Sequence, residues 1–91
     1  ILFTMTPFAF FYENNSRTSA YEHFTEEGYN RFRILLQNGE VVIIAPSGIR
    51  DAMNNIVWVQ SVTSGEFNQP HEFIQALGKG LEHSGFQVWD I

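Results

Sequence analysis

Carboxylate and imidazole side chains gather in one short stretch of this chain, Glu22-His23 followed by Glu26-Glu27. If the stretch is helical, His23 and Glu27 lie one turn apart on the same face, a spacing that suits an acid–base pair or two metal ligands. A solvated acidic turn uses the same residue types, and the sequence marks no third group that would fix their geometry. Residues 22–27 are therefore a candidate site that needs a partner from another segment.

Residues 46–54 are the second candidate site, because they form a longer connection than most and follow a well-defined strand. Loops held by a rigid hairpin often display binding groups, although turn chemistry explains this composition equally well. The candidate binding residues of this loop are Ser47, Arg50 and Asp51. A small enzyme or ligand-binding domain would need a pocket that joins this loop to the carboxylates of residues 22–27.

The pair His71-Glu72 begins the pattern H-E-x-x-H, in which two imidazoles one helical turn apart bind zinc. The second imidazole is missing, because Gln75 stands in its place. Cysteine is absent from the chain, which removes thiol catalysis and zinc–thiolate sites. The serine and threonine residues stand in turns and caps, without a recognisable nucleophile motif. We therefore expect no catalytic residues, no metal site and no cofactor.

A β-hairpin over residues 29–45 is the element that the sequence predicts most strongly. Two β-branched and aromatic runs are joined by Asn38-Gly39, the dipeptide most typical of a two-residue type I′ turn. Such a turn pairs Gln37 with Glu40 and so sets the register of both strands. One face of the hairpin is then wholly apolar and is the predicted core face: Phe32, Ile34, Leu36, Val41, Ile43 and Ala45.

The opposite face of this hairpin is predicted to carry Arg31, Arg33, Leu35, Val42 and Ile44. Large aliphatic side chains are unusual on a face that only water covers. In a contact surface the aliphatic residues would form the apolar centre, and the arginines would supply charge-assisted hydrogen bonds. We therefore expect a protein–protein interface on this face, in a homodimer or with another protein.

Three further strands are predicted. Residues 1–12 read as a first strand, and Pro7 places it at an edge or at a bulge, because proline cannot donate to a ladder. Residues 56–62 are apolar on both faces, which favours a central strand between two layers. Residues 86–91 read as a last strand.

The clearest predicted helix covers residues 70–84, with proline at its start and Gly85 just beyond its end. Gly78 and Gly80 within it indicate either a close approach to the sheet or early fraying. A capping-box pattern predicts a short helix over 20–27, but the same residues alternate equally well as a strand, so both options stay open. One helical turn at 49–53 is a further option.

Composition narrows the class of protein. With 91 residues, 44% of them hydrophobic and 16% charged, the chain is expected to form a single domain, residues 1–91. A net charge of −5 disfavours binding to nucleic acid and to anionic membranes. The apolar start lacks a basic segment and contains Pro7, which favours a strand over a signal peptide. No segment is apolar over the length of about 20 residues that spanning requires. We expect a soluble chain, and its compartment stays open.

The expected fold is α+β, a mostly antiparallel sheet of four to five strands. The C-terminal helix is expected to pack on the predicted core face of the hairpin, with the short N-terminal helix as an option. The expected function is that of a small acidic binding domain without catalysis. An alternative is the βαββαβ order of RNA-recognition domains, in which Tyr29, Arg31 and Arg33 would bind a single strand. The signature motif of those domains is missing from this chain.

Overall fold

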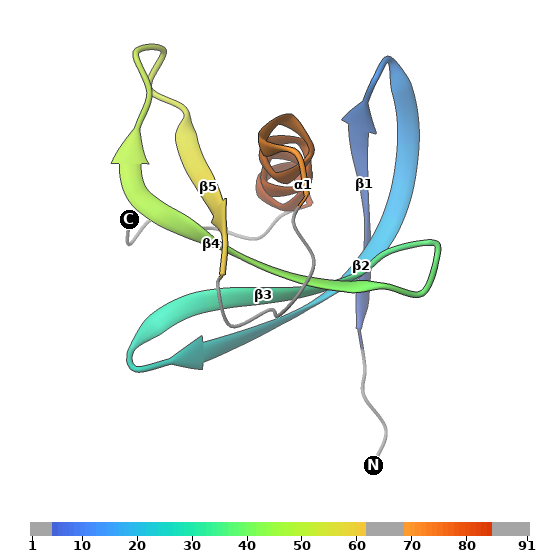
Figure 1. Cartoon of the computed structure of the whole chain (residues 1–91), viewed down its shortest axis with the longest axis horizontal. Coiled ribbons are helices and arrows are strands. Elements are labelled where there is room, and N and C mark those ends of the chain that lie inside the picture. Colours follow the sequence, from blue (N-terminus) through green and yellow to red (C-terminus); the bar gives the residue numbers. More distant parts are fainter. Residues whose placement is uncertain (1–4, 62–68, 85–91) are drawn as a thin grey trace.

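A computed structural model describes residues 5–61 and 69–84 of the chain. Its elements are β1 (Thr6–Tyr12), β2 (Asn15–Glu26), β3 (Tyr29–Leu35), β4 (Val41–Arg50), β5 (Ile56–Gln60) and α1 (His71–His83). Each strand pairs antiparallel with the next one in the chain, in the order β1-β2-β3-β4-β5. The sheet curls, and α1 lies inside the curl (Figure 1). This arrangement confirms an α+β fold with one C-terminal helix.

The long strand β2 replaces the short helix that was one option for residues 20–27. Residues 15–21 of β2 pair with β1, and residues 20–26 pair with β3, so the stretch predicted as a helix takes part in the sheet. Gly28, with a φ of +83°, belongs to the turn into β3 and does not cap a helix. Consequently His23 and Glu27 are not one helical turn apart. Within the described residues, β1 to β5 follow one another with no helix between them, which overturns the βαββαβ order.

The turn between β3 and β4 contains one residue more than predicted. The Leu36 N–H donates to the Glu40 carbonyl at 2.8 Å, so the loop comprises residues 37–39. Within it only Gly39 has a positive φ, +88°, as in a type I turn closed by a glycine bulge. The Asn38 side chain stabilises this form, because its Oδ1 accepts from the Glu40 N–H at 2.9 Å. The predicted two-residue turn is therefore wrong.

The extra turn residue changes which face of β4 points inward. Phe32 and Ile34 lie in the core as predicted, but their partners across the ladder are Ile44 and Val42. Both partners are fully buried, whereas Val41 is 43% exposed. The predicted inward positions of Val41 and Ile43 are therefore wrong, because a shift of one residue moves every side chain of a strand to the other face.

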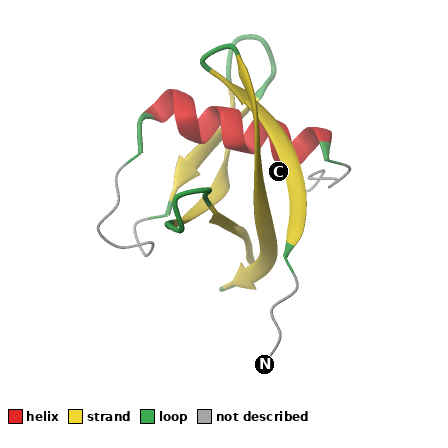
Figure 2. Cartoon of the chain, turned by 90° about the vertical axis from the view of Figure 1, so that its right-hand side faces the viewer, coloured by secondary structure: helices red, strands yellow, loops and turns green. Residues whose placement is uncertain are grey.

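The core is built from the inner faces of the strands and one face of α1. Its buried members are Phe8, Phe10, Phe32, Ile34, Val42, Ile44, Trp58, Ile74, Leu77 and Leu81. Figure 2 shows the helix running across the strands. Its contacts are most extensive with β1, and weaker with β5 and β4. Helix α1 thus joins the first and last strands of the described sheet.

The two glycines of α1 allow the helix to approach the sheet closely. A Cβ atom on Gly80 would lie 2.6 Å from Cβ of Phe10 and 2.7 Å from the carbonyl oxygen of Ala9. A Cβ atom on Gly78 would overlap the indole ring of Trp58. Both residues are buried inside a regular helix, so close approach is the reason for these glycines and fraying is not.

The positions of the first and last strands in the described sheet were predicted only in part. Strand β1, which contains Pro7, comes first in the order, as the proline predicted. Strand β5 comes last among the described strands, so the described residues show a neighbour on one side of it only, β4. Trp58 of β5 is buried, while its neighbour Val59 is 42% exposed. The strand predicted for residues 86–91 lies outside the described residues.

Among the described residues, no helix is long and apolar enough to cross a membrane.

Candidate functional site

The convex side of the curled sheet carries part of the predicted contact surface. Arg31, Arg33 and Leu35 point outward there, as predicted, but Val42 and Ile44 are fully buried in the core and are replaced by Val41 and Ile43. We use "outer face" for the cross-strand neighbours on this side: Glu22, Phe24, Glu26, Tyr29, Arg31, Arg33, Leu35, Val41, Ile43 and Val59.

Each arginine of the outer face lies between a carboxylate and an aromatic ring of the neighbouring residues. Arg33 Nη1 donates to Glu22 Oε1, and its guanidinium carbon lies 4.6 Å from the centroid of the Phe24 ring. The guanidinium of Arg31 lies 5.8 Å from the Tyr29 ring centroid, and its Nε is 3.7 Å from Glu26 Oε1. Each guanidinium thus has an aromatic and a carboxylate neighbour on the sheet.

An apolar strip runs beside these charges. Leu35 and Val41 face each other across β3 and β4, with exposed fractions of 39% and 43%. Ile43, the cross-strand partner of Arg33, is half-buried, and Val59 on β5 is 42% exposed. The residues of the strip come from three neighbouring strands, and Val59 lies opposite Ala45, which is buried.

The predicted loop of residues 46–54 is mostly a strand. Strand β4 continues to Arg50, with a register shift between Pro46 and Arg50, and no helical turn forms at 49–53. Ser47 Oγ accepts from the Ile49 N–H at 3.2 Å. Arg50 Nη1 donates to the Asn54 carbonyl at 2.9 Å. These two candidate residues are thus engaged in shaping the β4–β5 hairpin.

Asp51, the third candidate residue of that loop, organises the hairpin tip. Its Oδ1 accepts from the backbone N–H groups of Asn55 and Met53, both at 2.9 Å. The backbone hydrogen bond from Asn55 has the largest effect and lowers the pKa of Asp51 below its ordinary value, against an opposing effect of desolvation; the backbone hydrogen bond from Met53 lowers it further. Its carboxylate is therefore a structural acceptor in this turn.

The pKa of Asp51 is lower in the folded chain than in the unfolded chain. Asp51 therefore stabilises the fold at pH values above its unfolded-state pKa, and this stabilisation is lost as the pH falls through its folded-state pKa. We expect the Asp51 carboxyl to titrate below its ordinary value in a carbon-detected NMR titration. Asp51→Asn is expected to reduce the acid dependence of unfolding in the same pH range. Equal titration midpoints for Asp51 in the folded and the urea-unfolded chain would contradict the assignment.

The residues of 22–27 and of the β4–β5 hairpin do not meet. The β2–β3 turn and the β4–β5 tip point in different directions (Figure 1). His23 Nε2 lies 2.8 Å from Asn30 Oδ1 on the neighbouring strand. Among the described residues, no group of three or more His, Asp or Glu side chains could hold a metal ion. The three cavities described below are lined by neither segment.

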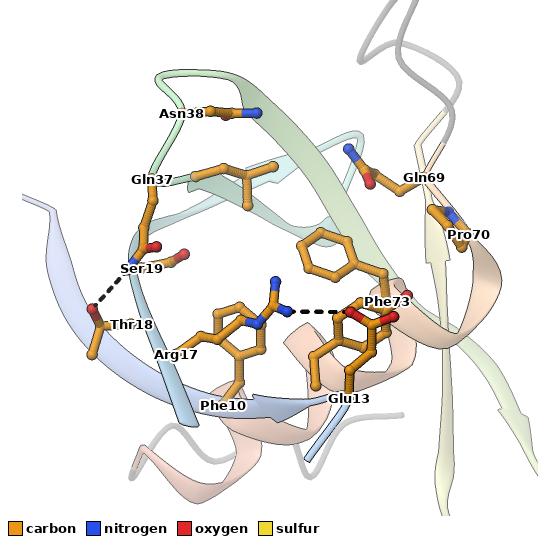
Figure 3. A pocket seen from close by; sticks show the side chains of 12 residues that line it. Phe10, Glu13, Arg17, Thr18, Ser19, Gln37, Asn38, Gln69, Pro70 and Phe73 are labelled. Carbon is orange, nitrogen blue, oxygen red and sulfur yellow. Dashed lines mark hydrogen bonds and ion pairs between the residues drawn. The ribbon is translucent and has the colours of Figure 1, made fainter. Parts of the chain in front are cut away.

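A cavity of about 430 Å³ opens at one end of the curled sheet. Its walls come from the β1–β2 hairpin, the β3–β4 turn and the start of α1 (Figure 3). The lining residues are Phe10, Tyr12, Glu13, Arg17, Thr18, Ser19, Leu36, Gln37, Asn38, Gln69, Pro70 and Phe73. Two other hollows lie between β1 and α1, with volumes of about 400 and 620 Å³. We call the first one the end cavity.

Arg17 is the cation of the end cavity. Its guanidinium carbon lies 5.1 Å from the centroid of the Tyr12 ring, and its Nη2 lies 3.2 Å from Glu13 Oε1. Tyr12 in turn meets Phe73 edge to face at 5.0 Å. Sequence reasoning missed this site, because Arg17 lies opposite Phe10 only once β2 is recognised as a strand.

Comparison with known proteins adds no assignment: no protein-family model matches the chain, and neither the curated proteins nor the solved structures contain a significant match.

Proposed function

We propose that this chain is a non-catalytic binding domain whose outer face forms a protein–protein interface, with a second copy of the chain as the partner. The observation that carries the proposal is the apolar strip of Leu35, Val41 and Val59, whose exposed fractions are 39%, 43% and 42%. Exposed apolar area beside charged side chains is the usual composition of an interface core with its rim.

The charges of the outer face favour a second copy over other partners. Two arginines stand beside two glutamates, so the face is locally balanced although the chain has a net charge of −5. In a two-fold arrangement the same patch meets itself, and a glutamate of one copy can approach an arginine of the other. Nucleic acid is disfavoured, because both arginines already face carboxylates of the same chain.

The geometry of Arg31 and Arg33 also supports an interface. Each guanidinium is held by a ring and a carboxylate before any partner arrives. Side chains that are already ordered lose less conformational entropy on association. Arginine and aromatic residues are, in addition, the types most enriched at interfaces.

Leu35→Asp is expected to convert a dimer into a folded monomer, because it places a carboxylate in the apolar strip. We expect at least a tenfold weaker dimerisation, about 1.4 kcal/mol or more, in sedimentation equilibrium. Circular dichroism should remain unchanged. The matched control is Ile49→Asp, which alters an aliphatic side chain, 65% exposed, on the β4–β5 hairpin and should leave the dimer intact. A wild-type chain that stays monomeric at millimolar concentration would refute the proposal.

A further inference from the structure

We infer that the end cavity is a binding site for a small carboxylate that carries a flat apolar group. The inference is independent of the proposed interface, since this open cavity is lined by the β1–β2 hairpin, the β3–β4 turn and the start of α1, and includes no residue of the outer face. Its volume of about 430 Å³ falls within the range of roughly 300–1,000 Å³ that is typical of small-molecule sites.

Aromatic side chains form the apolar part of the cavity. The rings of Phe10 and Tyr12 both meet the Phe73 ring edge to face, with centroids 5.9 and 5.0 Å apart. Leu36 contributes an aliphatic wall from the β3–β4 side. A planar apolar group fits such walls, because aromatic rings pack favourably in offset and edge-on arrangements.

Arg17 supplies the charge that selects a carboxylate. Its guanidinium lies over the Tyr12 ring at 5.1 Å, so its orientation is set before a ligand binds. Its partner Glu13 belongs to an exposed ion pair, with 36% and 66% of the two side chains accessible, and such pairs are weak. The Glu13 carboxylate thus shows where a ligand carboxylate would bind, and a ligand can displace it at little cost.

Polar groups at the rim complete the site. Gln37 and Asn38 come from the β3–β4 turn, and Gln69 lies just before α1 (Figure 3). The backbone N–H of Gln69 donates to Gln60 Oε1 at 3.1 Å, which ties this part of the rim to β5. The nearby start of α1 is the positive end of the helix dipole, and this adds to the preference for an anion.

A cationic ligand fits the end cavity less well, even though Glu13 is present. The position over the Tyr12 ring, where an ammonium group would gain a cation–π contact, is occupied by Arg17. A cation would also meet the like charge of that guanidinium. The sign of the ligand charge is therefore a direct test of the inference.

The first experiment compares phenylacetate, phenylacetamide and phenethylamine, which have similar shapes and charges of −1, 0 and +1. Each is titrated into the intact chain, and backbone amide shifts are followed by NMR. We expect phenylacetate to bind about tenfold more tightly than phenylacetamide, with shifts centred on the end cavity. Equal binding of the acid and the amide, tighter binding of the amine, or shifts centred elsewhere would overturn the inference.

The second experiment uses variants with opposite expected effects. Arg17→Gln should weaken phenylacetate binding about tenfold, and Glu13→Gln should strengthen it by about two- to fivefold by removing a competing carboxylate. The control Arg50→Gln removes the same charge from the β4–β5 hairpin and should change nothing. If Arg17→Gln and Arg50→Gln weakened phenylacetate binding equally, the effect would be one of net charge alone, and the inference would be overturned. Leu35→Asp should still bind phenylacetate, which separates this test from that of the interface.

Discussion

Val42→Asp is expected to unfold the chain in water at room temperature. The Val42 side chain of β4 is fully buried in an apolar core that contains no buried polar residue among those described. A carboxylate placed there has no cation to pair with, and a buried unpaired charge costs several kcal/mol. Small domains have a total stability of only about 5–15 kcal/mol, so this penalty removes much or all of it.

Val41→Asp is the matched control, because it makes the same change one residue earlier on the same strand. Val41 is 43% exposed on the outer face, and the variant should fold with a loss of about 0.5 kcal/mol or less. Circular dichroism and urea unfolding measure both variants. A two-residue Asn38-Gly39 turn would reverse the two results, so the pair also tests the register of the hairpin.

Gly78→Ala is expected to destabilise the protein strongly, although alanine is the better helix former. The exchange would gain about 1 kcal/mol of helix propensity on an open helix. Here the added Cβ overlaps the Trp58 indole, and overpacking of this kind typically costs about 1–3 kcal/mol beyond any gain. Urea unfolding should therefore show a lower midpoint with an unchanged slope.

The cause of that loss can be isolated with Trp58→Phe. The smaller ring leaves room for the new methyl group, so Gly78→Ala should cost less in the Trp58→Phe background than in the wild type. The indole Nε1 also donates to Glu82 Oε2 at 3.0 Å, and Trp58→Phe alone is expected to be destabilising for that reason. Independent, additive effects of the two substitutions would show that the helix can move away from β5.

Patterns of residue type were sufficient to predict the helix and the inward face of β3. The helix over 70–84 has an amphipathic period and end signals, and α1 spans His71–His83. The turn of the hairpin was not predicted, because Asn38-Gly39 is compatible with loops of two or three residues. The three-residue loop is the one stabilised by a hydrogen bond from the Glu40 N–H to the Asn38 side chain, and composition does not indicate this bond. The inward face of β4, and with it two of the five predicted contact residues, Val42 and Ile44, followed from that choice.

Residues 20–27 show a second reason for incomplete prediction. The capping-box pattern of Ser19 and Glu22 is a genuine local helix signal. Sheet pairing overrides it: residues 20–26 pair with β3, and Ala20 and Tyr21 pair with β1 as well. The end cavity could not be predicted from the sequence because it, too, depends on strand pairing. Its residues come from distant segments, and Arg17 joins them only through the pairing of β2 with β1.

The packing of α1 on β1 also bears on how the chain folds. Each hairpin between consecutive strands of the sheet forms from residues close in sequence and closes only a short loop. Docking of α1 on β1 instead closes a loop of about sixty residues, from Tyr12 to His71, and among the described elements it is the contact with the greatest separation in sequence. The hairpins between consecutive strands therefore supply the local contacts during folding, and docking of the helix supplies the non-local contact. The inner face of the curled sheet can therefore be buried only after α1, near the end of the described chain, has docked on β1.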